Sequence, residues 1–452
     1  MSRAQAYEQM PYQGLPYGQT HPDRLALLAA LHGLPAADPD SCRVLELGCG
    51  DGVNLVGMAA AIPGLSALGI DAAAGPLERG RSYADELKLD NIELRAADID
   101  DPGPLGTFDY AIAHGVWTEL DDERREALFA LLADVVAEDG LAYISYTCLP
   151  AGRMRALARD VAWWLARGST RAESRIALLQ DGMRALEPWT VKRGDAYGQV
   201  LGQELTRMRD ARDDRLRHDE LAEAWQPSWL GEVAAAASRH GLRFLCEADP
   251  AELRDGWLPE HADRLVDQLA GEDPVARGEA IDVLTGRAFR RSVFCRADTA
   301  PEPFSPAGLR RLRVGPDRVP FSDWAAGRSD PDAEVLAGAR TGALELQAAP
   351  ARFVRSPGER PEAFPLARLQ AAAGEDVINL RHENVVFDEP YPRLVVTALD
   401  GTRNREELIA HLTSEVEHMN LVAERGEALR ATVTTGLEPS LQTMAELALL
   451  IG

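Results

Sequence analysis

The sequence lacks the features that mark membrane, disulfide-bonded and nucleic-acid-binding proteins. Among its 452 residues there is no run of eighteen apolar residues, and the polar, aromatic N-terminus has no apolar signal core. The five cysteines are scattered and include no C-x-x-C pair, which favours reduced thiols over a disulfide framework or a zinc site. The net charge of −24 opposes binding to nucleic acid or an anionic membrane. We therefore expect a cytoplasmic protein that has no metal site and binds neither.

The most informative stretch is RVLELGCGDGVNL, at residues 43–55. A short apolar run with an acid inside it, Glu46, predicts a buried parallel strand. Gly48, Gly50 and Gly52 follow at alternate positions, and Asn54 opens a helix predicted over residues 54–61. A strand, a glycine-rich turn and a helix bring backbone N–H groups and a helix N-terminus close to a ligand.

A second strand, predicted over residues 66–70, ends at Asp71, about twenty residues after the glycine turn, where a carboxylate can hold ribose hydroxyls. Further strands are predicted at residues 91–95, 108–113 and 141–147, with helices near 75–88 and 121–138 and a helix stop at Gly140. This alternation predicts an α/β fold with a parallel, Rossmann-like sheet. Two later β-type runs, 242–249 and 290–298, are interpreted as the last strands of a seven-stranded sheet.

The predicted domain organisation follows from these elements. Residues 1–150 hold an N-terminal arm and the Rossmann-like core, 151–228 a helical insertion, and 229–298 the end of the core. A proline-rich linker at 299–307 precedes an α+β unit at 308–452, with β-like runs ARFVRS and PRLVVTALDG and a helical tail capped by Asn404 or Thr402. Prolines and glycines among the arm's tyrosines argue against a regular helix there. The charge run TRMRDARDDRLRHDEL is interpreted as a solvated helix face.

Parallel sheets bind ligands beyond the carboxyl ends of their strands. The glycine turn there lacks the Lys-Ser/Thr pair of a phosphate-binding loop, and its third glycine comes too early for G-x-G-x-x-G. E-x-G-x-G-x-G after a first strand, with an acid ending the second, resembles the cofactor site of class I S-adenosylmethionine-dependent methyltransferases. A cationic sulfonium with an ammonium group suits an acidic, glycine-lined turn, whereas a pyrophosphate does not.

A narrower resemblance extends over residues 5–300. The arm with PY and THPDRL, then LELGCGDGVNL, FDYAIAHGVW, ISYTCLPAG and RLRHDEL, is similar to bacterial methyltransferases with a regulatory domain, a set that includes rickettsial-type protein-lysine methyltransferases. This resemblance implies a winged-helix-like C-terminal domain, a protein or peptide substrate methylated on lysine nitrogen, and an insertion that dimerises or holds the substrate. Ala151-Gly152 departs from the glycine and aromatic that the lysine methyltransferases carry there.

The resemblance also assigns site residues. It implies cofactor contacts, with S-adenosyl-L-homocysteine as product, from the following residues: Glu46, Gly48, Cys49, Gly50, Asn54, Asp71, Asp98, Ile99, His114 and Gly115. Asp71 would hold the ribose, and Asp98 with Ile99 the adenine. An aromatic, partly dry channel would lower the pKa of a lysine acceptor. The residues predicted around it are His114, Trp117, Tyr146, Tyr12 and Tyr17, with His114 as base or structural group and Trp117 as wall or core.

Several other functions fit the sequence less well or stay open. A DNA amino-methyltransferase needs Asn/Asp-Pro-Pro-aromatic after the fourth strand, where this chain has HGVW. A metal-dependent O-methyltransferase needs clustered carboxylates there, but Glu119, Asp121 and Asp122 are better explained by a helix N-terminus. A small-molecule or peptide natural-product methyltransferase stays open. So does a non-catalytic S-adenosylmethionine-binding interaction module, although the intact glycine turn and ribose acid favour an enzyme.

Overall fold

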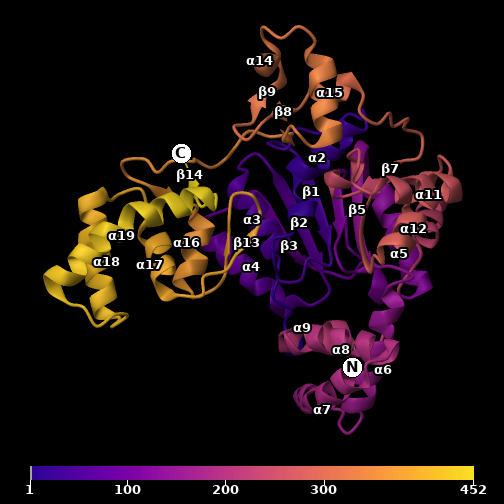
Figure 1. Cartoon of the computed structure of the whole chain (residues 1–452), viewed down its shortest axis with the longest axis horizontal. Helices are drawn as coiled ribbons and strands as arrows, with labels where there is room; N and C mark the ends of the chain where they lie inside the picture. The colour runs from indigo at the N-terminus through magenta and orange to yellow at the C-terminus, as the bar shows by residue number, and fades with distance from the viewer. Residues whose placement is uncertain (1–2, 452) are drawn as a thin grey trace.

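A seven-stranded mixed sheet forms the centre of the chain (Figure 1) in the computed structural model, which describes residues 3–451. Its strand order is β3-β2-β1-β4-β5-β7-β6, and β7 runs antiparallel to its neighbours β5 and β6. The strands are β1 (Arg43–Leu47), β2 (Ser66–Asp71), β3 (Ile92–Ala96), β4 (Phe108–Ala113), β5 (Val136–Thr147), β6 (Leu242–Glu247) and β7 (Phe289–Arg296). All seven predicted strands are confirmed, as is the α/β Rossmann-like fold.

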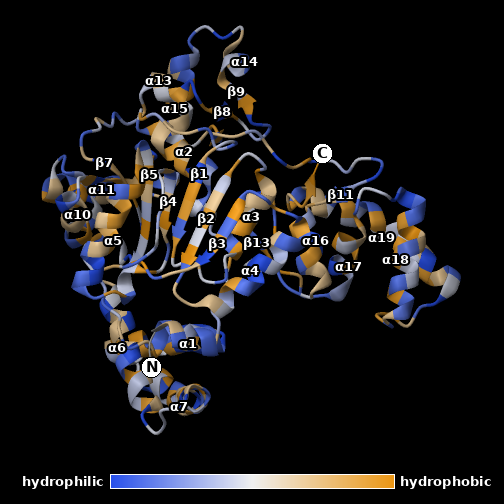
Figure 2. Ribbon diagram, turned by 180° about the vertical axis from the view of Figure 1, so that it is seen from behind, coloured by the Kyte–Doolittle hydropathy of each residue, from blue (hydrophilic) through white to orange (hydrophobic). Residues whose placement is uncertain are grey.

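Helices cover both faces of this sheet because side chains from alternate strand positions are buried on each face (Figure 2). One face packs against α2 (Pro22–Leu31) and α3 (Val53–Ala61), and the other against α5 (Asp122–Val135) and α10 (Leu230–Arg239). Helix α4 (Ala74–Leu87) lies beside α3 and β3. Within residues 3–451, no helix is long and apolar enough to cross a membrane.

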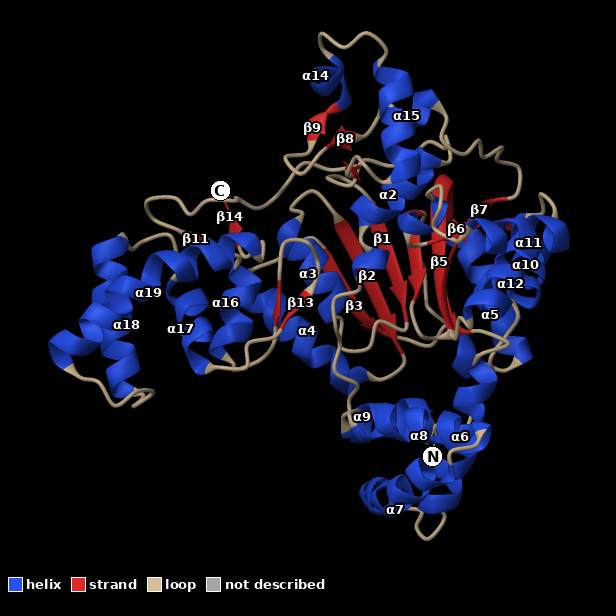
Figure 3. Cartoon of the chain, in the orientation of Figure 1, coloured by secondary structure: helices blue, strands red, loops and turns tan. Residues whose placement is uncertain are grey.

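The insertion after β5 is helical, as predicted. It consists of α6 (Gly152–Ala166), α7 (Ala172–Arg193), α8 (Ala196–Arg209), α9 (Asp213–Arg215) and the π-helical turn η3 (Leu216–Glu220). Figure 3 shows the arrowheads of β1, β2 and β3 pointing towards the side of the molecule where these helices lie. The insertion therefore stands over the carboxyl ends of the strands, the edge at which parallel sheets bind ligands. Helices α11 (Glu260–Ala270) and α12 (Pro274–Thr285) connect β6 to β7.

The C-terminal part packs around two separate hydrophobic clusters. The first shares its core with α2 and comprises α13 (Pro306–Leu309), β8 (Arg313–Val314), β9 (Val319–Pro320), α14 (Phe321–Ala325), α15 (Pro331–Thr341) and β10 (Leu346–Gln347). The second is the winged-helix domain, with β11 (Glu362–Ala363), α16 (Pro365–Ala372), β12 (Val377–Ile378), β13 (Asn384–Val385), α17 (Pro390–Ala398), α18 (Arg405–His418), α19 (Gly426–Glu446) and β14 (Leu450–Ile451). Asn404 caps α18 in a capping box, as predicted.

Four local predictions are wrong. The run ARFVRS, residues 351–356, forms no strand but an irregular segment in which Phe353 packs into the second hydrophobic cluster. The arm does contain a helix, α1 (Arg3–Gln9), because its prolines and glycines begin only at Pro11. The run PRLVVTALDG is not β-like: Pro390 stands in the first turn of α17, whose Val395, Val396 and Ala398 are buried. Gly140 lies inside β5 and does not stop a helix, since α5 ends at Val135 and the backbone bulges between two β4–β5 pairs.

The charge run of residues 206–221 is not a solvated face. Asp214, His218 and Glu220 are buried. Glu220 accepts charge-assisted hydrogen bonds from Arg155 at 3.1 Å and Arg207 at 2.9 Å. Periodicity alone did not reveal this, because the partners come from two other helices of the insertion.

A buried ionic cluster joins the last two strands to α12. Arg290 on β7 is 1% exposed and donates to Asp282 at 2.7 and 3.0 Å. A second donor group of Arg290 reaches Glu247 on β6. Removing one partner of such a cluster leaves buried charges without compensation.

Replacing Arg290 by Met should therefore cost about 3 kcal/mol of unfolding free energy, because Asp282 and Glu247 would lose their close hydrogen bonds and keep only the longer ion pairs to Arg287, at 3.4 and 3.5 Å. Thermal or urea unfolding followed by circular dichroism measures the loss. Arg264→Met is the matched control, since Arg264 makes an exposed pair with Glu260 worth less than about 1 kcal/mol. Equal effects of the two substitutions would contradict this role of Arg290.

Candidate functional site

The glycine turn after β1 has the geometry that only glycine adopts without strain. Gly48, Gly50 and Gly52 have φ values of 71°, 60° and 75°. A Cβ on Gly48 would meet Val116 at 2.6 Å, and one on Gly52 would meet Leu94 at 2.7 Å. Gly50 differs, because nothing lies within 4 Å of the position of its Cβ. The turn is thus packed on both flanks and open at its centre.

Glu46 carries an unsatisfied oxygen beneath this turn. Its side chain is 2% exposed, and Oε1 accepts a hydrogen bond from Asn54 Nδ2 at 3.0 Å. Oε2 is buried and has no hydrogen-bond partner among the residues that the structure describes. Burial, assisted by the nearby carboxylates of Asp51 and Asp71, raises the pKa of Glu46 to about 8 against the lowering effect of the Asn54 bond. A cationic donor would satisfy both the orphaned atom and the charge.

Asp71 ends β2 beside the same turn. Its Oδ2 accepts from the N–H of Gly50 at 2.8 Å and its Oδ1 from the N–H of Ala73 at 2.9 Å. A carboxylate oxygen can accept more than one hydrogen bond, which suits Asp71 to a place beside a ligand hydroxyl. The contact to Gly50 also fixes the open centre of the turn against the end of β2.

Asp98 and Ile99 follow β3, as predicted, on the outer side of the site. The Asp98 side chain is 46% exposed and pairs with Arg124 from the first turn of α5. Ile99 packs against the core cluster on the α5 face. Asp121 caps α5 by accepting from the N–H of Arg124 at 2.9 Å, which confirms the helix-terminus interpretation of the acids after the fourth strand.

His114 and Tyr17 meet at the end of β4. Their rings stack with centroids 3.7 Å apart. The Nδ1 of His114 lies 3.1 Å from both the Tyr143 hydroxyl and Ser145 Oγ, and Ser145 Oγ also accepts from the N–H of Gly115 at 2.8 Å. No atom lies within 4 Å of the position of a Cβ on Gly115, so this strand end is open as Gly50 is.

The environment of His114 argues against a role as general base. Burial, and then the charge of Arg291, lower the pKa of His114 to about 3. The imidazole is therefore neutral at pH 7 and holds an abstracted proton poorly. Its ring instead stacks on Tyr17 and so packs the arm against the end of β4.

Two residues predicted around a channel lie in the core. The Tyr146 side chain is fully buried, and its hydroxyl lies 3.3 Å from Ser292 Oγ. Trp117 is 2% exposed, packs against Phe129 and donates to Ser228 Oγ at 3.0 Å. Strand alternation explains the first error: Tyr143 and Ser145 point to the face that holds His114, and Tyr146 points to the opposite face. Trp117 is therefore a core residue and does not form part of a channel wall.

The arm and the insertion form the remaining side of the site. Tyr7 stacks on His218 of η3 with centroids 3.9 Å apart, and its hydroxyl donates to Glu119 at 3.4 Å. Tyr12 is tilted against the same imidazole at 6.3 Å. Burial raises the pKa of Asp219, the next residue of η3, to about 6. His218 and Asp219 were not predicted as site residues, because a charged run gives no sign of which members face inward.

Asn54 and Cys49 are placed behind the turn. Asn54 is 3% exposed, and its amide uses all of its principal hydrogen-bonding positions inside the protein. The Cys49 side chain packs in the hydrophobic cluster of the winged-helix domain, which leaves only its backbone to line the turn. Of the predicted cofactor residues, Glu46, Gly50, Asp71, His114 and Gly115 gather at one strand edge.

Comparison with known proteins identifies the parts of this architecture. Residues 44–140 match a methyltransferase domain, residues 212–296 a predicted methyltransferase regulatory domain, and residues 359–449 a PKMT C-terminal winged helix domain. PKMT2 from Rickettsia typhi has 20% sequence identity and a TM-score of 0.85, and the match covers 98% of this chain and 100% of that one. The same protein in complex with AdoHcy gives a TM-score of 0.83 at 19% identity, with the same coverage.

Curated relatives extend the comparison. An uncharacterized protein of Rickettsia prowazekii is 30% identical over 65% of this chain and 53% of its own length, so the match spans about half of that relative. A second one from the same organism is 25% identical over 53% of this chain and 96% of its own length.

The sheet order and the match over residues 44–140 identify this part of the chain as a methyltransferase domain with a class I fold. That domain is joined in the same chain by segments that match a predicted methyltransferase regulatory domain and a PKMT C-terminal winged helix domain, in agreement with the resemblance found in the sequence.

Buried neutral histidines should make the fold sensitive to acid. Burial lowers the pKa of His21 to about 3, so between pH 6.5 and 3 the unfolded chain binds a proton that the folded chain does not. Its contribution to stability is complete above pH 6.5 and falls by about 1.4 kcal/mol for each pH unit below that.

His21→Asn tests this contribution, because His21 Nδ1 accepts from the N–H of Asp23 as the N-cap of α2 and asparagine keeps a cap acceptor without titrating. Melting temperatures at pH 7.5 and 5.5 should differ less in the variant than in the wild type. The same pH dependence in both proteins would contradict the assignment.

Proposed function

We propose that the protein is an S-adenosyl-L-methionine-dependent methyltransferase that methylates lysine side chains of a protein substrate. The observation that carries the proposal is the orphaned Oε2 of Glu46, buried below an open glycine turn whose centre is tied to Asp71. An ammonium group supplies the missing donor and the missing positive charge together. AdoHcy in the structure of PKMT2, whose fold matches over 98% of this chain, supports the same cofactor class.

The residues present fit the two ends of such a cofactor. Glu46 would pair with the ammonium of the methionine part along the backbone of Gly48, Cys49 and Gly50. Asp71 would accept from the ribose hydroxyls, and Asp98 with Ile99, after β3, would lie on the adenine side. Asn54 acts by fixing the carboxylate of Glu46.

When bound, the cofactor supplies a methyl carbon activated by its sulfonium, and the protein aligns and desolvates the acceptor. His114 and Gly115 end β4, with Tyr17 stacked over His114. Tyr17 and Tyr12 line the approach from the arm, and Asp219 stands beside Tyr12. A lysine must lose a proton before it attacks. On the side of the arm and insertion, Asp219 would be the carboxylate that accepts this proton, because burial raises its pKa to about 6.

A protein acceptor is supported by the PKMT winged-helix domain and by the shape of the arm and insertion. The insertion holds η3 against the tyrosines of the arm, which gives an aromatic and acidic wall suited to a cationic chain. Action in the cytoplasm is supported by five free, buried cysteines. A homodimer through the insertion stays a prediction, as does the expectation that nucleic acid and membranes are not bound.

Calorimetry with S-adenosylhomocysteine tests the cofactor assignment. Pairing with an ammonium requires the Glu46 carboxylate, whereas the free protein holds this group protonated below about pH 8. Binding should therefore release a proton, and affinity should rise by up to about tenfold per pH unit from pH 6 to 8 and level off above. Glu46→Gln should bind more weakly and remove most of this dependence.

Asp71→Ala should weaken the same binding at least about tenfold, through loss of charge-assisted hydrogen bonds to the ribose. Asp90→Ala is the control, because Asp90 is exposed in the turn before β3. No binding by the wild-type protein, or equal affinities for the two variants, would rule out the cofactor site.

Transfer of a tritiated methyl group to a cell lysate, followed by mass spectrometry, tests the acceptor. We expect label on lysine side chains of protein, and a strong reduction with Tyr17→Ala because Tyr17 stacks on His114. Tyr197→Ala is the control, since Tyr197 is exposed at the far end of the insertion. Label confined to small molecules would favour the natural-product alternative, and firm cofactor binding without label would favour a non-catalytic module.

A further inference from the structure

Three parts of the chain converge on the amide of Asn54. Its Nδ2 donates to Glu46 Oε1 at 3.0 Å and to Thr20 Oγ1 at 3.1 Å. Its Oδ1 accepts from the N–H of Tyr17 at 2.9 Å and lies 2.7 Å from His382 Nε2. The cofactor strand, the N-terminal arm and the winged-helix domain are therefore joined at one buried side chain.

This network fixes the tautomer of His382. A backbone N–H is only a donor, so the Asn54 atom that faces Tyr17 is the oxygen. His382 Nε2 must then carry its hydrogen and donate to that oxygen. Burial, and then the neighbouring His21, lower the pKa of His382 well below its usual value, so the ring is neutral.

The conformation of the β12–β13 hairpin in the winged-helix domain places the His382 ring against Asn54. His382 lies between β12 and β13 at φ 59°, a left-handed conformation that is costly for a residue other than glycine. Asn379 holds the tip, because its Oδ1 accepts from the N–H groups of Arg381 and Glu383 at 2.9 Å each. On α3, Gly57 leaves room for the ring: a Cβ there would lie 3.0 Å from His382 Cε1.

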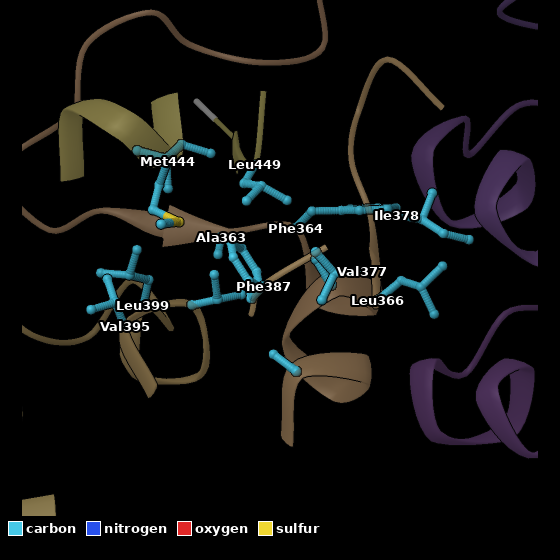
Figure 4. Close-up of a cluster of buried hydrophobic side chains, with 14 of the residues drawn as sticks. Ala363, Phe364, Leu366, Val377, Ile378, Phe387, Val395, Leu399, Met444 and Leu449 are labelled. Atoms are coloured by element: carbon cyan, nitrogen blue, oxygen red, sulfur yellow. The ribbon is translucent and has the colours of Figure 1, made fainter. Parts of the chain in front are cut away.

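Wider contacts dock the domain on the cofactor turn. Cys49, Val53 and Val56 share one hydrophobic cluster with the winged-helix domain. Figure 4 shows Leu366 and Ile378 on the side of that cluster nearest the purple helices of the core. The hairpin tip is therefore part of a broad interface with the turn and α3.

Ion pairs strengthen the same interface. Arg79 on α4 bonds Asp51 of the glycine turn at 2.6 Å and also pairs with Glu375, which precedes β12. The Tyr83 hydroxyl donates to Glu375 at 2.7 Å.

We propose that His382 is a positioning residue for the cofactor, and that the winged-helix domain is thereby a working part of the cofactor site. This inference rests on the proposed function. By donating to Asn54 Oδ1, His382 holds the amide so that its Nδ2 occupies Glu46 Oε1 and leaves Oε2 for the ligand. The same oxygen holds the N–H of Tyr17, so cofactor placement and the arm over His114 depend on one contact.

His382→Ala and His382→Gln provide the test in the full-length protein. Glutamine places an amide N–H near the position of Nε2, so it restores the donor that alanine removes. We expect S-adenosylhomocysteine to bind His382→Ala about tenfold more weakly, the effect of one lost hydrogen bond of about 1.4 kcal/mol, and His382→Gln within about threefold of the wild type. Arg381→Ala, an exposed change in the same tip, should bind as the wild type does.

A double-mutant cycle with Glu46→Gln distinguishes positioning from general destabilisation. If His382 acts through Asn54 on Glu46, His382→Ala should cost less than about threefold in the Glu46→Gln background. Should His382→Ala fail to fold, Gly57→Ala displaces the ring from the other side and should weaken binding in the same way.

Two results would overturn the role of His382: unchanged affinity of His382→Ala in a folded protein, or equal weakening by alanine and glutamine with additive effects in the cycle. No binding by the wild type would instead remove the proposed function on which this role depends.

Discussion

The site depends on one buried carboxylate that the protein satisfies only in part. One carboxylate oxygen of Glu46 accepts from Asn54, and the other has no hydrogen-bond partner within residues 3–451. Above it lies a turn whose three glycines all have positive φ. Leaving a buried acceptor unpaired is costly, and burial raises the pKa of Glu46 to about 8 as a result. A cation with N–H donors would pair the free oxygen and neutralise the buried carboxylate. Both changes would add to the free energy of binding.

Holding that carboxylate requires contacts from distant parts of the chain. The amide of Asn54 forms hydrogen bonds with Tyr17 and Thr20 of the arm and with His382 of the winged-helix domain. Through Tyr17 the same network reaches His114, whose low pKa suits a neutral stacking platform better than a base. The arm and the winged-helix domain therefore contact both the proposed cofactor site and the end of β4.

Local sequence predicted the elements that local physics determines. The seven strands, the glycine turn, Asp71 at the end of β2 and the Asn404 cap follow from apolar runs, glycine spacing and capping chemistry. Tyr146 was predicted for the site although strand alternation places Tyr143 there, so the error lay in choosing the face. The run PRLVVTALDG was misjudged because its burial against α16 and α19 decides its conformation, and β-branched residues alone do not.

The acceptor side could not have been predicted in the same way, since long-range contacts create it. Tyr7 meets His218, more than two hundred residues later, and η3 turns that imidazole inward out of a run of charges. Such contacts leave no periodic trace in the sequence. The asymmetry has a physical basis: the proposed donor site uses backbone geometry and one acid, whereas the proposed acceptor side uses side chains brought together from arm and insertion. Substitutions in those two segments can therefore change the acceptor while the turn at Gly50 and its tie to Asp71 stay intact.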